Sequence, residues 1–90
     1  MALLQPIVNT TEDFGAIIRA ERRARGLTQT HAAELAGVSY RLWNETERGK
    51  RTQLGMDTAL RMLQTLGLDL RIESRAQRSI GAKHDAASQG

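Results

Sequence analysis

The chain contains no cysteine, a single proline and only three aromatic residues among its 90 positions. The absence of cysteine excludes a disulfide framework and a thiolate metal site, and it suits a reducing cytoplasm. Because Phe14, Tyr40 and Trp43 are the only aromatic side chains, the core must consist mainly of Leu, Ile and Ala. A core of this size is marginal for a single domain, so we expect dimerisation to contribute to stability.

The sequence also lacks an apolar run long enough to cross a membrane. Its first eight residues, MALLQPIV, are too short for a secretion signal and lack a charged start and a cleavage site. The two histidines, His31 and His84, have no carboxylate or thiol at ligand spacing, which argues against a metal site. Neither Ser39 nor Ser79 has a nearby histidine base, and no glycine-rich phosphate loop occurs. We therefore expect a cytoplasmic protein that is not an enzyme and needs no cofactor.

Basic side chains are concentrated in two runs, although the net charge is only +3. The first run precedes residue 27 and the second follows residue 47; they comprise Arg19, Arg22, Arg23 and Arg25, and Arg48, Lys50 and Arg51. One such run is commonly just a solvated face of a helix. Two runs that flank a compact helical motif indicate phosphate groups as the partner.

The spacing of apolar residues predicts four helices, over residues 10–25, 29–36, 40–47 and 56–66. Thr10 and Asp13 have the spacing of a capping box at the first helix, and Thr28 and Ser39 are placed to cap the next two. Gly26, Gly49 and Gly67 follow the first, third and fourth predicted helices as stop signals.

Residues 27–51, LTQTHAAELAGVSYRLWNETERGKR, fit two short helices that cross at a steep angle, as in a helix-turn-helix. Ala33 is small where a larger side chain would push the second helix away. Gly37 suits the left-handed turn, Val38 fills the angle between the helices, and Trp43 faces the core. The alternative, two amphipathic helices joined by an ordinary glycine stop, requires all of these features to coincide by chance.

After residue 67 the apolar period changes from about 3.6 to 2, which predicts a half-buried strand. Its buried face is Leu68, Leu70 and Ile72, which alternate with Asp69, Arg71 and Glu73. A lone strand needs a partner, and the simplest is the same strand of a second subunit, antiparallel about a two-fold axis. The alternative is pairing with residues 3–8. We therefore divide the chain into an extended lead (1–9), one DNA-binding and dimerisation domain (10–74) and a disordered tail (75–90).

Four sequence segments resemble the XRE (Cro/cI-type) helix-turn-helix family, and most closely its HipB-like antitoxins. They are GLTQ (26–29), LAGVS (35–39), ERGK (47–50) and LRMLQTLGLDLRI (60–72). The resemblance covers residues 14–72. It implies a mostly α, lambda-repressor-like bundle of four to five helices, with one short C-terminal strand that pairs across a dimer. The family usually has an aliphatic residue where this chain has Thr46, and a buried threonine needs a partner for its hydroxyl.

A recognition helix presents its N-terminal, outward-facing residues to base edges. The candidate base contacts are therefore Ser39, Tyr40, Arg41, Asn44 and Glu45. Arg41 is the strongest, because its guanidinium can donate two hydrogen bonds to guanine, whereas Glu45 either accepts from cytosine or stands off in a salt bridge. Gln29 matches the family position that bonds a phosphate. The candidate phosphate contacts are Thr28, Gln29, Lys50, Arg51 and Thr52.

Together these expectations describe a homodimeric, sequence-specific repressor that binds an inverted-repeat operator, with half-sites about 10 base pairs apart. The HipB-like resemblance further implies the antitoxin of a type II toxin-antitoxin system, bound to a HipA-like serine/threonine kinase and repressing its own operon. Two alternatives remain. One is a free-standing regulator without a toxin, and the other is an antitoxin that acts mainly by protein contact.

Overall fold

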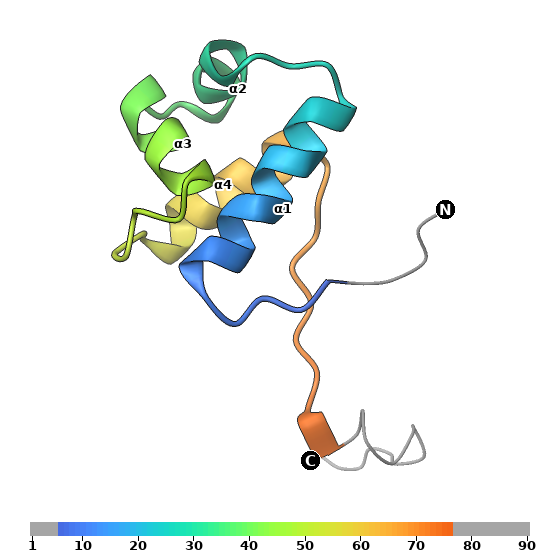
Figure 1. Cartoon of the computed structure of the whole chain (residues 1–90). Helices are drawn as coiled ribbons and strands as arrows, with labels where there is room; N and C mark the ends of the chain where they lie inside the picture. Colours follow the sequence, from blue (N-terminus) through green and yellow to red (C-terminus); the bar gives the residue numbers. More distant parts are fainter. Residues whose placement is uncertain (1–5, 77–90) are drawn as a thin grey trace.

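The computed structural model describes residues 6–76, and these residues form four helices (Figure 1). The helices are α1 (Thr11–Ala24), α2 (Gln29–Ala36), α3 (Tyr40–Glu47) and α4 (Met56–Thr65). The prediction of a mostly α helix-turn-helix bundle is confirmed, and each helix lies within one residue of its predicted position. The first five residues of the predicted lead, and the predicted tail from residue 77 onward, lie outside the described residues.

Hydroxyl caps explain where the first three helices begin. The Thr10 hydroxyl accepts a hydrogen bond from the Asp13 N–H at 3.0 Å, and the Asp13 carboxylate accepts one from the Thr10 N–H at 3.2 Å. Thr28 accepts from the His31 N–H and Ser39 from the Leu42 N–H, each at 3.0 Å. Each bond satisfies a backbone donor that the first turn of a helix otherwise leaves unpaired.

The core lies where the four helices meet, and its largest fully buried side chains are Trp43, Ile18, Met62 and Leu66. The buried side chains of α2 are all alanines: Ala32, Ala33 and Ala36. Methyl side chains let α2 approach α3 and α4 closely, as the helix-turn-helix crossing requires. Gly37 ends α2 with φ of 72°, the left-handed conformation that glycine adopts without steric cost.

Contact between α1 and α3 depends on Gly15, a residue that the sequence did not single out. Gly15 is buried, and a Cβ atom added to it would overlap the backbone carbonyl oxygen of Thr46. Thr46 is itself buried, and its hydroxyl donates to the Leu42 carbonyl at 2.8 Å. That bond supplies the partner which a buried threonine needs.

The predicted strand does not form in the single chain: none of residues 6–76 is in a strand. Residues 68–74 continue from α4 without regular structure, and Pro6, Ile7 and Val8 are not paired with them. Both segments nevertheless line one hollow beside α1. Ile72 is 91% exposed there and Leu70 is 49% exposed. Pairing across two subunits stays a prediction, since the structure describes a single chain and residues 6–76 contain no partner strand.

Candidate nucleic-acid interface

The first turns of α3 present three long polar side chains on the outside of the helix-turn-helix. Tyr40 is 52% exposed, the Arg41 side chain is 83% exposed, and Asn44 is half-buried. Ser39 is also exposed, but its hydroxyl already serves as the cap of α3. We call Ser39, Tyr40, Arg41 and Asn44 the reading face.

Glu45, which the sequence placed among the base contacts, lies between two arginines. The Arg41 Nε–H donates to Glu45 Oε2 at 3.0 Å, and Arg51 Nε lies 3.2 Å from Glu45 Oε1. The hydrogen bond from Arg41 lowers the pKa of Glu45, and the charges of Arg41, Arg51 and Arg48 lower it further, so that Glu45 is ionised at neutral pH. Glu45 was expected either to accept a hydrogen bond from cytosine or to form a salt bridge. In the structure it forms salt bridges.

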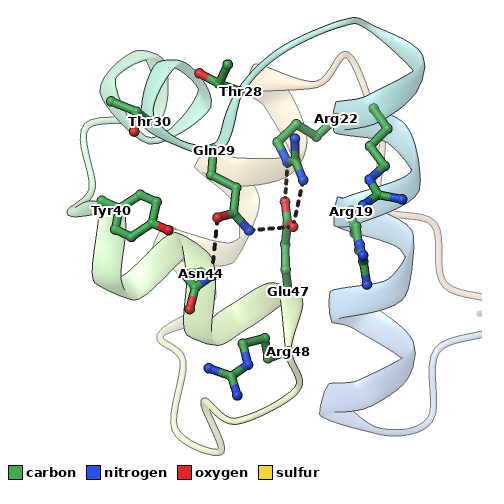
Figure 2. Close-up of a pocket in the computed structure, with 10 residues that line it drawn as sticks. Arg19, Arg22, Thr28, Gln29, Thr30, Tyr40, Asn44, Glu47 and Arg48 are labelled. Atoms are coloured by element: carbon green, nitrogen blue, oxygen red, sulfur yellow. Dashed lines mark hydrogen bonds and ion pairs between the residues drawn. The ribbon is translucent and has the colours of Figure 1, made fainter.

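Gln29 links the reading face to the buried interior (Figure 2). The Gln29 Nε2 donates to Glu47 Oε1 at 2.8 Å, while Gln29 Oε1 accepts from Asn44 Nδ2 at 3.2 Å. Because an amide nitrogen carries two hydrogens, one N–H of Gln29 remains for a phosphate. The structure thus gives Gln29 a role that its predicted phosphate contact did not include: it orients the Asn44 amide.

Glu47 is the acceptor at the centre of this network. Arg22 donates to both of its oxygens, from Nε at 2.5 Å and from Nη2 at 3.0 Å, and the Trp43 indole N–H donates at 2.6 Å. Burial raises the pKa of Glu47, but the hydrogen bonds from Arg22, Gln29 and Trp43 outweigh it, so the pKa lies below its ordinary value. Arg22 and Glu47 are only 9% and 8% exposed.

Arg22 therefore differs from the other arginines of its run, and the prediction that it faces phosphates was wrong. Its third bond, from Nη1 to the Leu27 carbonyl at 2.7 Å, ties it to the loop before α2. The sequence signal was ambiguous, because nothing in a run of arginines marks the one that turns inward.

A polar hollow of about 670 Å³ lies between α1 and the start of α2 and α3 (Figure 2). Its lining includes three exposed arginines from two segments, Arg19, Arg23 and Arg48, together with Thr28 and Thr30. Among these, Thr28 was predicted individually as a phosphate contact, and the three arginines were predicted to face phosphates as members of the two basic runs. We call Arg19, Arg23 and Arg48 the flanking arginines. The two basic runs of the sequence predicted the positive charge of these residues. They did not predict that residues from two segments would line the same hollow.

The remaining predicted phosphate contacts lie between α3 and α4. Lys50 and Thr52 are exposed, and Arg51 is half-buried beside Glu45. Between residues 6 and 76, no three His, Asp or Glu side chains come together to hold a metal ion. None of the helices in this part of the chain has the length and apolar character needed to span a membrane.

Three comparisons place this geometry among known proteins. A family model described as "Helix-turn-helix domain" matches residues 13–77. The chain is 38% identical over 72 residues to an uncharacterised HTH-type transcriptional regulator, y4mF, of Sinorhizobium fredii (strain NBRC 101917 / NGR234), covering 79% of this chain and 92% of that protein. It is also similar to the crystal structure of the restriction-modification controller protein C.AhdI from Aeromonas hydrophila. The TM-score is 0.62 at 29% identity, over 66% of this chain and 88% of the controller.

Proposed function

The chain belongs to the helix-turn-helix domain family, of the XRE type that its sequence resembles, and on this premise we propose that it is a sequence-specific transcriptional repressor. The observation that carries the proposal is the reading face on α3. Tyr40, Arg41 and Asn44 project from the first turns of a helix whose own position is fixed by a buried network. A recognition helix held this way presents those side chains to base edges in the major groove.

Three of the four residues of the reading face have a distinct DNA partner by their chemistry, whereas the Ser39 hydroxyl caps α3. Arg41 donates two hydrogen bonds to O6 and N7 of a guanine, and Asn44 pairs with an adenine. Tyr40 touches a thymine methyl group or a phosphate. The phosphate contacts are Thr28, Gln29, Lys50, Arg51 and Thr52, together with the flanking arginines. These contacts fix the register of α3 in the groove without reading sequence.

Selection of duplexes from a randomised library by the full chain tests this function. We expect an inverted repeat whose half-sites contain a guanine for Arg41 and are spaced by about 10 base pairs. Enrichment of no sequence would overturn the proposal.

The two-fold symmetry of such a site requires a dimer, and residues 68–72 offer a self-complementary edge for one. In an antiparallel pairing centred on Leu70, Asp69 faces Arg71 of the second copy and Leu68 faces Ile72. A pairing centred on Arg71 instead places Asp69 opposite Glu73 and Arg71 opposite itself. A pairing centred on Ile72 matches charges but places Leu70 opposite Ser74. The Leu70-centred register is therefore the one that we propose.

This pairing also explains the apolar residues that one chain leaves in water. Leu70 and Ile72 are exposed, as are Ile7 and Val8 across the hollow beside α1. A second copy of residues 68–72 covers these side chains and satisfies the strand edge at the same time.

Within this function, the HipB-like resemblance of residues 60–72 supports the more specific role of an antitoxin that binds a HipA-like serine/threonine kinase. A second candidate is a controller of a neighbouring restriction-modification system, favoured by the structural likeness to such a controller over 88% of its length. Co-purification of the chain with the product of the adjacent gene separates the two candidates. A kinase that remains bound supports the antitoxin, and a neighbouring endonuclease gene with no bound partner supports the controller.

A further inference from the structure

Glu45 occupies an unusual place for an acidic residue, in the middle of a surface expected to approach DNA. It lies on α3, one turn after Arg41 and beside the first residues of the loop that follows α3. Its carboxylate uses one oxygen for Arg41 and the other for Arg51. The Glu45 side chain is 28% exposed, compared with 83% for Arg41.

The contact with Arg41 uses only one edge of the guanidinium. Glu45 accepts from Nε, whereas recognition of guanine O6 and N7 uses a pair of parallel N–H donors. A carboxylate bound at Nε therefore leaves the Nη1 and Nη2 end of Arg41 available. It also restricts the rotamers of a long, exposed side chain before DNA arrives, which reduces the entropy lost on binding.

The contact with Arg51 has a different effect. Arg51 Nε is buried and has no hydrogen-bond acceptor among residues 6–76, so charge alone holds it to Glu45. A negative carboxylate at this place offsets part of the attraction of Arg51 and Arg41 for phosphates. Because attraction to phosphates is independent of sequence, this offset weakens binding to every duplex alike.

We propose that Glu45 is a specificity-determining residue that touches no base: it aligns Arg41 for guanine and weakens the attraction of the α3 surface for phosphates. The inference rests on the proposed DNA-reading function. Its consequence is that removal of the carboxylate strengthens binding to arbitrary DNA while it relaxes the guanine preference of Arg41.

The test compares Glu45→Gln with Glu34→Gln in the full chain. Glu34 is exposed on α2, and its substitution changes the net charge by the same amount. Each variant is measured against two duplexes at several salt concentrations: the site that the unmodified chain selects from a random library, and a scrambled duplex of equal length and composition. Selection is then repeated with Glu45→Gln to read the base preferences.

We expect Glu45→Gln to bind the scrambled duplex about three- to tenfold more tightly at 0.1 M salt, with a steeper salt dependence. The ratio of selected-site to scrambled affinity should fall about tenfold, with relaxed preference at one base pair of each half-site. Glu34→Gln should change both affinities by the same small factor and leave the ratio unchanged.

An affinity ratio for Glu45→Gln equal to that of Glu34→Gln would overturn the proposal, as would an unchanged preference for guanine. Failure of the unmodified chain to select any site is a different result. That result removes the proposed function itself, and the Glu45 inference with it.

Discussion

Arg22 of α1 and Glu47 of α3 form a buried, two-point ion pair that joins the first helix to the recognition helix. The Glu47 carboxylate also accepts from Trp43 in the core and from Gln29, which in turn accepts from Asn44 on the reading face. A buried carboxylate is stable only when such donors replace the water that it loses. The same five-residue network therefore satisfies the buried charge and fixes the orientation of the Asn44 amide, which we propose to face DNA.

Replacement of Glu47 by glutamine should destabilise the fold by about 3–5 kcal/mol, because it leaves the Arg22 guanidinium buried without a counter-charge. Urea denaturation followed by circular dichroism measures the free energy of unfolding. Glu34→Gln, at an exposed position, is the matched control and should change it by less than about 0.5 kcal/mol. A cost below about 1 kcal/mol for Glu47→Gln would mean that the ion pair is unimportant for folding.

The same carboxylate should make stability depend on pH. The pKa of Glu47 is lowered in the folded chain, so its contribution is complete above the ordinary value of 4.5 and is lost as the pH falls through the folded pKa. The difference in unfolding free energy between the unmodified chain and Glu47→Gln should therefore shrink below about pH 4.5. Urea titrations between about pH 3 and 7 measure this difference. A difference that stays constant over this range would contradict the assignment.

Gly15→Ala should destabilise the protein although alanine is the better helix former. In an exposed helix interior this change stabilises by about 1 kcal/mol. At Gly15 the added methyl group meets the backbone carbonyl oxygen of Thr46, so α1 must move away from α3, and we expect a net loss of about 1–3 kcal/mol. Thermal unfolding checks the sign, with Ala16→Gly at a neighbouring exposed position of α1 as the control for helix propensity. A higher midpoint for Gly15→Ala is the contrary result.

Arg41→Ala and Lys50→Ala should weaken DNA binding in different ways. Loss of Arg41 should cost about 1–3 kcal/mol on the selected site and relax the preference at one base pair. Loss of Lys50 should weaken all duplexes alike and lower the slope of log K against log salt by about one. Binding isotherms at several salt concentrations measure both effects. If Arg41→Ala kept the full base preference, Arg41 would not be a base contact.

The Leu70-centred dimer predicts the outcome of a charge exchange. Asp69→Arg or Arg71→Asp alone places like charges opposite each other twice per dimer, and each should raise the dissociation constant about ten- to a hundredfold. The double variant Asp69→Arg/Arg71→Asp should restore the dimer. In the Ile72-centred register the same double variant places like charges together and does not restore it. Sedimentation equilibrium distinguishes the two registers, and a dimer that no single variant weakens would exclude both.

The fold could be predicted largely because its signals are local. Thr10, Thr28 and Ser39 cap helices through bonds that span three residues, and Gly37 ends α2 by its own backbone conformation. No local pattern in the sequence indicated the contacts between helices. Gly15 was not singled out, since the sequence does not reveal that the backbone of Thr46 lies against it.

In the candidate site, too, features set by local sequence were predicted, whereas features set by packing between helices were not. Arg41 and Tyr40 were predicted from their place at the start of α3, and the structure leaves both exposed. Arg22 was assigned to the phosphate-facing run, but it pairs with Glu47, which lies 25 residues further along the chain. A run of charges shows how much charge a segment carries, whereas the packing of α1 on α3 decides which charge is buried.

The most direct test of the central claim is the equilibrium affinity of the full chain for its selected duplex and for a scrambled duplex of equal composition at 0.15 M salt. Sequence-specific recognition by α3 predicts that the selected duplex binds at least about a thousandfold more tightly. Equal affinity for the two duplexes, with the same salt dependence, would contradict it.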